Sequence, residues 1–532
     1  MEIIQINPIL KSNSVSLSKL EQEAAEDARY RHLIIKSNEK LEISSLNGCN
    51  TWILGVHLTQ KEAMFYDSFV KGFMVSVSPQ FSHISLQPST VFIPHGVKQS
   101  LVREAFYSCG AAFLCWNSNG LIGDAKQKGH NCTRMIYNFL EHNEIKNNEN
   151  WLLVAILCLC LRERYLEQDI STTMFHLTTA LKIIRKWQEY KLQRYKVGKL
   201  LYKKNSFIDR DDEELLPLDI EQAYVNDNIF DGSTEFETMD THIPGKLKST
   251  YDYNTSESEE IFSYQISEQC FSNTSIIPKI EVTTNERTLI ESFIYNYSIN
   301  LFLCDDSVIR FVASPFKIFK ELKPFLINPV YNCSDPSMNN PIMGAALPAF
   351  ELVAKANWLA LKYPLNERGV AIASQIQTHA KLLSCNTPHT SSFSNLPPYL
   401  QRRIKESHHL KEIVSNCVWI FMEKLIHPEM SSTCTNIQNL VESTIVLIEK
   451  LSLHSPISVI CTWPFAILGT VLIHVYQREY LELRISEFDE AVRMKCLSTI
   501  THFLSLVWEK HDQDGKGWDV LLDKHFLRQL FL

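Results

Sequence analysis

The sequence predicts an all-α protein, an irregular array of packed helices interrupted by a long acidic insertion. Three observations lead to this prediction. Apolar residues recur at helical spacing in both halves of the chain. No run of alternating Val, Ile and Thr lies between Asn-Gly turns, so almost no sheet is expected. Glycine is scarce, with 16 among 532 residues, which favours long helices over an enzyme fold rich in tight turns.

The first helical block is expected over residues 56–205, after a flexible, polar N-terminal arm at 1–55. Within this block, segment 78–96 contains Pro79, Pro94 and Gly96 and is expected to be a loop. Apolar residues at helical spacing predict two helices. They are Phe65, Phe69, Phe73 and Met74 in the first, and Leu101, Ala105, Cys109, Ala112, Phe113 and Trp116 in the second.

Residues 206–283 are expected to form an acidic, polar insertion without fixed structure. Residues 209–260 hold 16 acidic and three basic side chains, a net charge of −13, whereas the whole chain carries −8. The remainder is therefore at −8 + 13 = +5. Such a composition buries too little apolar surface to fold on its own. Two interpretations stay open: an activation or partner-binding segment with aromatic anchors such as Phe230 and Tyr251, or an insertion without a role.

The second helical block is expected over residues 284–532. Two of its helices have clear apolar faces. The faces consist of Leu410, Ile413, Val414, Cys417, Val418, Phe421 and Leu425, and of Ile437, Leu440, Val441, Thr444, Ile445, Ile448 and Leu451. Segment 451–477 has no charged residue and is long enough to span a bilayer. Pro456 and Pro464 interrupt it, so a pair of buried helices with a proline break is expected instead.

A basic stretch from Lys182 to Lys204 carries nine basic residues and one acidic residue, with four aromatic residues between them. One interpretation is a nuclear-import signal or a phosphate-contacting surface. The other, which we favour, is a long helix with a solvated basic face that folds back against the acidic insertion.

The remaining polar motifs predict no catalytic, cofactor-binding or metal site, and no cofactor. Asp211–Glu214 and Asp305–Asp306 resemble the aspartate-rich motif of helical terpenoid enzymes, but the second metal-binding helix is out of register at Glu449. Segment Asp512–Gly517 lacks the ligands of a calcium loop, because Lys516 stands at the fifth ligand position. The 14 cysteines form no Cys-x-x-Cys pair, and neither Ser-His-Asp nor phosphate-loop spacing is present.

Two closely spaced pairs of Cys and His residues are not expected to be metal ligands. Cys158 and Cys160 lie inside an apolar run and are interpreted as buried thiols in a reducing compartment. His408 and His409 are adjacent, so they point to different faces of a helix, and we expect both at the surface.

Three segments together resemble a known family. The C-terminal pair, Trp463–Gly469 and Leu504–Asp512 followed by Trp518, is similar to the regulatory domain of fungal zinc-cluster transcription factors, the second class of fungal-specific transcription factor domain. Segment Asp335–Gly344 resembles the family's Asp…Gly turn, and Phe65–Pro79 its opening helix. In this comparison Pro464, Gly469, Trp508 and Trp518 are fold determinants: a first-turn proline, a close helix crossing and two large buried rings.

The resemblance implies a nuclear transcription regulator without enzymatic activity. Its expected partners are the transcription machinery or a DNA-binding protein, with a small-molecule effector and a homodimer as further expectations; no membrane contact is expected. The family's zinc cluster needs six cysteines, yet Cys49 is the only one before residue 100. Contact with DNA is therefore expected to be indirect, unless a zinc cluster lies upstream of Met1. The alternative is a dimeric, non-catalytic scaffold in a chromatin-bound assembly.

Overall fold

The computed structural model describes residues 52–531 apart from 54–55, 75–79, 117, 144, 146–148, 167–169, 207–281, 305–311, 386–395, 453–454 and 515. Most of the predicted insertion at 206–283 and of the arm at 1–55 thus lies outside the described residues. The described elements before residue 207 are one two-residue β-hairpin and a series of helices. They are β1 (Trp52–Ile53), β2 (Val56–His57), α2 (Gln60–Ser68), the π-helix η2 (Phe69–Phe73), η3 (Ile84–Leu86), α4 (Pro88–Lys98), α5 (Ser100–Leu114), η4 (Asn119–Leu121), α6 (Ile122–His142), α7 (Asn150–Arg162), η5 (Glu163–Tyr165) and α8 (Ile170–Ser206).

The described elements after residue 281 are all helical. They are α9 (Thr284–Asn300), η9 (Leu301–Leu303), α11 (Pro315–Ile327), η10 (Pro336–Asn339), η11 (Gly344–Ala346), α12 (Leu347–Ala360), α13 (Glu367–Cys385), α14 (Pro398–Ile426), α15 (Thr435–Glu449), η13 (Pro456–Ile460), α16 (Thr462–Thr470), α17 (Val475–Val492), α18 (Lys495–Asp514), η14 (Gly517–Leu522) and α19 (Lys524–Phe531). The predicted all-α class is confirmed.

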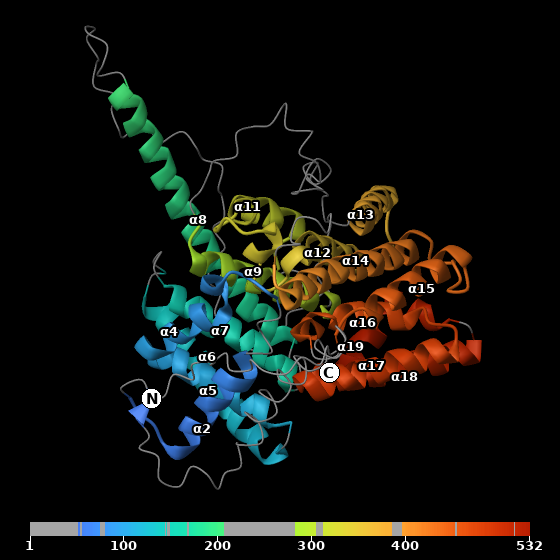
Figure 1. The fold of residues 1–532 in the computed structure, drawn as a ribbon, viewed down its shortest axis with the longest axis horizontal. Helices are drawn as coiled ribbons and strands as arrows, with labels where there is room; N and C mark the ends of the chain where they lie inside the picture. Colours follow the sequence, from blue (N-terminus) through green and yellow to red (C-terminus); the bar gives the residue numbers. More distant parts are fainter. Residues whose placement is uncertain are drawn as a thin grey trace, which may run out of the picture.

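Two helices form the centre of the molecule. Residues 152–161 of α7 are all apolar and all buried, as expected of a helix that is hydrophobic on every side. Helix α9 is buried almost as completely, although it carries charged and amide side chains. Helix α9 contacts α7 and α8 on one side and α12 on the other. Figure 1 shows α9 between the blue-to-teal helices of the first half and the yellow-to-red helices of the second.

The two halves are also joined by polar contacts at long sequence separation. The hydroxyl of Thr288 donates to the carbonyl of Leu86 at 2.9 Å. Arg185 of α8 pairs with Glu321 of α11 at 2.9 Å. The expectation that the two blocks pack together therefore holds among the described residues, while the residue boundaries of the predicted domains stay a prediction.

Close helix crossings depend on small residues in both halves. A Cβ atom at Gly110 of α5 would lie 1.8 Å from the carbonyl oxygen of Phe65, so α2 and α5 touch backbone to backbone. A Cβ atom at Gly469 of α16 would lie 2.3 Å from Leu504 of α18. These crossings explain the small residues that the sequence places in the second predicted helix and in the C-terminal pair.

Two expectations for the first block are wrong. The predicted loop at 78–96 is helical from Pro88 onward: α4 begins at Pro88, whose fixed φ suits the first helical position, and continues past Pro94. Val91 and Phe92 are buried, and this packing outweighs the hydrogen bond that Pro94 cannot donate. Trp116 is 48% exposed because α5 ends at Leu114, so the helical periodicity does not extend to it.

The uncharged segment 451–477 forms short buried elements rather than one long helix. Pro456 starts η13 and Pro464 lies in the first turn of α16, so a proline break separates them as predicted. In the part of the chain that the structure describes, no helix combines the length and the apolar character needed to cross a membrane.

Candidate functional site

A buried arginine lies where the two halves meet. Arg164, in η5, follows the apolar helix α7 directly and is 6% exposed. Its Nη1 donates to the hydroxyl of Tyr295 in α9 at 2.6 Å, and its guanidinium carbon lies 4.4 Å from the centre of the Tyr295 ring. The Tyr295 hydroxyl in turn donates to the carbonyl of Val459 in η13 at 3.1 Å. The side chain of Tyr295 thus connects α9 to η5 and to η13, two elements that lie far from α9 in the sequence.

The charge of Arg164 has no acidic partner among the described residues. The neighbouring Glu163 instead accepts from Arg162, whose Nη1 also donates to Ser108 at 3.1 Å. The second amino nitrogen of Arg164, Nη2, has no hydrogen-bond partner. Burial raises the pKa of the nearby Cys496 thiol to about 12, so this neighbour is neutral. A buried cation without a counter-charge is unusual in a folded protein.

A second polar centre fixes the turn that connects α11 to α12. Glu291 of α9 is fully buried, and its Oε1 accepts the backbone N–H groups of Ile342 at 3.1 Å and Met343 at 2.5 Å. One helical turn earlier, Arg287 donates to the carbonyls of Asn339 and Phe325 and to the side chain of Asn340. Burial raises the pKa of Glu291 to about 8.

The same turn is fixed at its ends by α14. The Asp335 carboxylate accepts the N–H of Ser337 at 2.7 Å and lies 3.2 Å from Nε2 of His408. Burial acts to raise the pKa of Asp335, but hydrogen bonds from His408 and Ser337 hold it below its ordinary value. Gly344 adopts a φ of 56°, and Ser407 accepts the N–H of Ala345. The predicted Asp…Gly turn that opens a helix is therefore present, and its contacts are structural.

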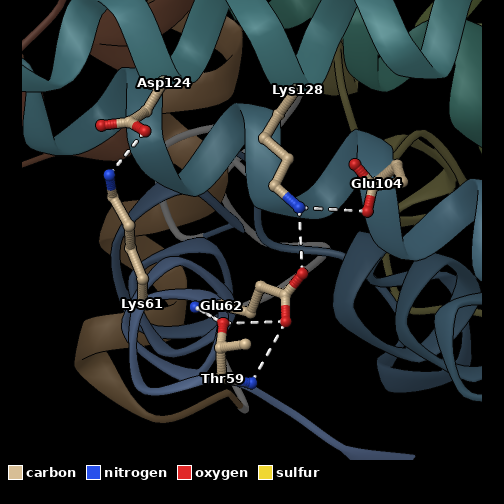
Figure 2. Close-up of polar contacts among 6 residues, drawn as sticks. All are labelled: Thr59, Lys61, Glu62, Glu104, Asp124 and Lys128. Atoms are coloured by element: carbon tan, nitrogen blue, oxygen red, sulfur yellow. Dashed lines mark hydrogen bonds and ion pairs between the residues drawn. The ribbon is translucent and has the colours of Figure 1, made fainter.

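A third cluster joins α2 to α5 and α6. Figure 2 shows Lys128 of α6 between two carboxylates, at 3.0 Å from Glu62 and 3.2 Å from Glu104. Glu62 also accepts the backbone N–H of Thr59 and closes the capping box at the start of α2. Burial acts to raise the pKa of Glu62, but hydrogen bonds from Lys128 and Thr59 hold it below its ordinary value. This cluster fixes a helix start.

The basic stretch is part of one long helix. Helix α8 has 37 residues and extends well beyond the body of the molecule in Figure 1. Near the body, Lys191 pairs with Glu286 at 2.6 Å, and Trp187 is buried. Side chains from Arg194 onward lie outside the described ones, as does the acidic insertion, so the predicted contact between them stays a prediction.

The other motifs are placed as follows. Asp512 lies on α18, and both of its carboxylate oxygens accept from Nη1 of Arg478, at 2.9 and 3.0 Å. Asp211–Glu214 and Asp305–Asp306 lie outside the described residues. Among the residues that the structure describes, no group of three His, Cys, Asp or Glu side chains could hold a metal ion.

The expectation that His408 and His409 lie at the surface is wrong, whereas Cys158 and Cys160 are buried as expected. Both histidines are partly buried, not at the surface, since α14 packs against the Asp335 turn. Burial lowers the pKa of His409 to about 4. Cys158 and Cys160 are buried free thiols, and burial raises the pKa of each. Both thiols are therefore protonated at neutral pH.

The C-terminal pair has the predicted contacts with one difference. Trp518 is buried, and Trp463 donates to the side chain of Asn357 at 3.1 Å. Trp508 is only half-buried, because its Nε1 donates to the carbonyl of Gly469 at the edge of the crossing between α16 and α18.

A shallow depression lies between the C-terminal helices. Its lining residues are Tyr363, Pro428, Asp519, Leu522, Asp523 and Lys524. Asp519 there pairs with Lys424, and Lys524 donates to the carbonyl of Leu361. The polar groups at this depression are thus engaged in contacts within the protein.

Comparison with known proteins gives one family. Residues 272–529 match the model of the fungal specific transcription factor domain, and no zinc-cluster family matches the chain. No curated protein and no solved structure is significantly similar to it. The match covers α9 through α19 and thus includes the Asp335 turn and the C-terminal pair. It does not include Arg164.

Proposed function

We propose that this protein is a transcription regulator, because residues 272–529 match the fungal specific transcription factor domain. We infer that it acts in the nucleus, as the family implies, and that it has no catalytic activity of its own. Its output would come from contacts with the transcription machinery or with a DNA-binding partner. This inference extends the family assignment to a mode of action.

An exposed apolar surface on the matched domain carries this proposal. Val446 of α15 and Val475, Tyr476 and Leu483 of α17 are between 46% and 65% exposed. The hydroxyl of Tyr476 donates to Glu442 of α15 at 2.9 Å, so the two helices are in contact at this surface. Apolar side chains gathered in this way are typical of a surface that binds another protein.

The proposal is tested by tethering the full chain, fused to an unrelated DNA-binding module, at a reporter promoter in a fungal cell. We expect reporter transcript to change severalfold relative to the module alone. The double variant Tyr476→Ala and Leu483→Lys should remove most of that change without unfolding the protein. Tyr399→Ala, at an exposed tyrosine of α14, is the matched control and should behave as wild type.

Unchanged transcript, with the fusion present in the nucleus at normal level, contradicts the proposed regulator. If the protein then forms a stable dimer by sedimentation, the scaffold alternative replaces it. Sensing of a small molecule belongs to the same proposal and rests on the family resemblance alone.

A further inference from the structure

Helix α17 carries much of the strongly exposed apolar surface of the described chain. Three of the four most exposed large apolar side chains among the described residues, Val475, Tyr476 and Leu483, lie on this helix. Tyr476 and Leu483 are seven residues apart and therefore lie on the same side of α17, about two turns from each other. Single exposed apolar residues are common in folded proteins, whereas a row of them along one side of a helix needs an explanation.

Helix α15 extends this surface. Tyr476 of α17 donates to Glu442 of α15 at 2.9 Å, and Arg484, two turns further along α17, donates to the carbonyl of Ile448 at 3.2 Å. The two helices therefore lie alongside each other over this length. Val446 follows Glu442 by four residues, so it lies on the same side of α15, and it is half exposed. We call the surface formed by Val446, Val475, Tyr476 and Leu483 the docking face.

The charges on these two helices are divided by sign. The two arginines of α17, Arg478 and Arg484, are buried and contact Asp512 and main-chain carbonyls. Lys450, which follows α15 directly, acts electrostatically on Glu412 of α14. In contrast, every exposed charged side chain that the structure describes on α15 and α17 is acidic. These side chains are Glu442, Glu449, Glu479, Glu482 and Glu490.

This negative charge limits what can cover the docking face. Nucleic acid and anionic lipid are themselves negative and would be repelled. Two docking faces from two copies of the chain would set carboxylates against carboxylates, which is also unfavourable. A basic segment of another protein is complementary in charge. An amphipathic helix also matches the spacing, because its apolar residues repeat over the same distance of about 10 Å that separates Tyr476 from Leu483.

We propose that the docking face binds an amphipathic helix of a partner protein, and that the polar side of this helix is rich in lysine and arginine. The apolar side of the partner's helix covers Val446, Tyr476 and Leu483, and its cations pair with Glu479 and Glu482. This inference rests on the proposed function, because it names the class of partner that the exposed surface of the matched domain takes.

The test is a fluorescence-anisotropy titration of the purified full chain into a labelled helical peptide that has leucines on one side and lysines on the other. We expect saturable binding that weakens as salt is added. Two comparison peptides carry glutamate in place of every lysine, or serine in place of every leucine, and each should bind at least about tenfold more weakly. No binding of the lysine peptide, or equal affinity for the glutamate peptide, overturns the proposal.

Variants decide whether the peptide binds at the docking face. The double variant Glu479→Lys and Glu482→Lys should bind the lysine peptide about tenfold more weakly and should gain binding of the glutamate peptide. This gain cannot come from unfolding, so the result does not depend on unchanged stability. The matched control is Glu141→Lys and Glu189→Lys, which makes the same change in charge at exposed positions of α6 and α8 and should behave as wild type. An equal loss in the control would mean that only the net charge matters, and it would overturn the proposal.

Two further outcomes separate this inference from its rivals. If the purified chain is a dimer by sedimentation and Leu483→Lys dissociates it, a second copy covers the docking face and the proposal is overturned. The peptide assay uses no promoter, so it fails or succeeds independently of the tethering experiment. A protein that binds the lysine peptide but leaves transcript unchanged contradicts the proposed regulator and leaves the docking face standing. A transcript change without peptide binding leaves the regulator standing and overturns the basic helix as its partner.

Discussion

Helices α7 and α9 occupy the same kind of place in the molecule and are buried in different ways. Helix α7 is apolar from Leu152 to Leu161 and needs no partner for any side chain. Helix α9 is equally enclosed, but Arg287, Glu291 and Asn296 lie on it, fully buried. The hydrogen bonds of Arg287 and Glu291 reach the turn before α12, 53 and 52 residues later, whereas Asn296 donates within α9 to Ser292. One helix is held by the hydrophobic effect, and the other is held by specific acceptors and donors.

The difference teaches where mutations act. A defect in α7 depends on volume and polarity at the mutated position, whereas a defect in α9 propagates to the Asp335–Gly344 turn that its side chains hold. The first two variants below exchange the properties of the two helices, and the next two test the turn and the ionisation of Glu291.

The largest effect is expected when α7 is given a polar side chain like those of α9. Leu157 is fully buried, so Leu157→Asn leaves a cavity and an amide without partners. We expect a loss of about 5 kcal/mol in the free energy of unfolding, read from urea denaturation of the purified protein. Leu192→Asn on the exposed part of α8 is the control, with a change below about 0.5 kcal/mol. Equal losses in the two variants would show that α7 is not a core helix.

The reverse exchange makes α9 apolar. Arg287→Met removes the donor that serves Asn339, Phe325 and Asn340, and it leaves buried acceptors unsatisfied. The expected loss is about 4 kcal/mol, with a disordered Asp335 turn detected as new proteolytic cleavage between residues 328 and 346. Arg185→Met, at a half-buried pair, should cost no more than about 1 kcal/mol. Intact protease resistance would mean that the turn does not depend on α9.

A third variant disturbs the turn itself and leaves both helices unchanged. At Gly344, φ is 56°, and an added Cβ would lie 2.2 Å from the hydroxyl of Ser407. Gly344→Ala should therefore cost about 3 kcal/mol. Gly123→Ala in α6 has free space around it and should be neutral or stabilising by up to about 1 kcal/mol. A neutral result at Gly344 would contradict the tight contact between the turn and α14.

The smallest expected effect is a pH dependence of the free energy of unfolding caused by Glu291 of α9. The apolar run 152–161 of α7 has no carboxyl group that could cause one. The pKa of Glu291 is raised to about 8 by burial, so its stabilising contribution is complete below about pH 4.5 and is lost as the pH rises toward 8. Between pH 6 and pH 8 wild type should lose about 2 kcal/mol more than Glu291→Gln, whose amide oxygen still accepts the two N–H groups. Parallel pH profiles of the two proteins in urea denaturation would exclude this role of Glu291.

The sequence predicted the elements that have a local apolar pattern and missed those that depend on distant partners. The apolar run of α7 and the faces of α14 and α15 were predicted, because hydrophobic patterning is a local signal. The crossing of α16 and α18 at Gly469 was expected from the family resemblance of the C-terminal pair. The helix α4 was missed, because Pro94 is a local breaker that only tertiary packing overcomes. The burial of α9 was also missed, since its partners lie far along the chain.

The candidate site was missed for a related reason. Arg164 follows an apolar run, where a charged residue usually marks the end of a helix at the surface. The trio Arg162, Glu163 and Arg164 did offer a signal, because no turn residue separates it from the buried helix. Only the three-dimensional structure shows that Glu163 neutralises one arginine and leaves the other without a counter-charge.

The position of α9 also has a consequence for inheritance. The family match begins at residue 272, so a gene rearranged at that point would keep α9 but lose α4, α7 and α8, which cover one of its sides. The shortened product would expose a core helix to water and aggregate. Such a rearrangement is therefore expected to yield no stable protein, although the family model matches residues 272–529 alone.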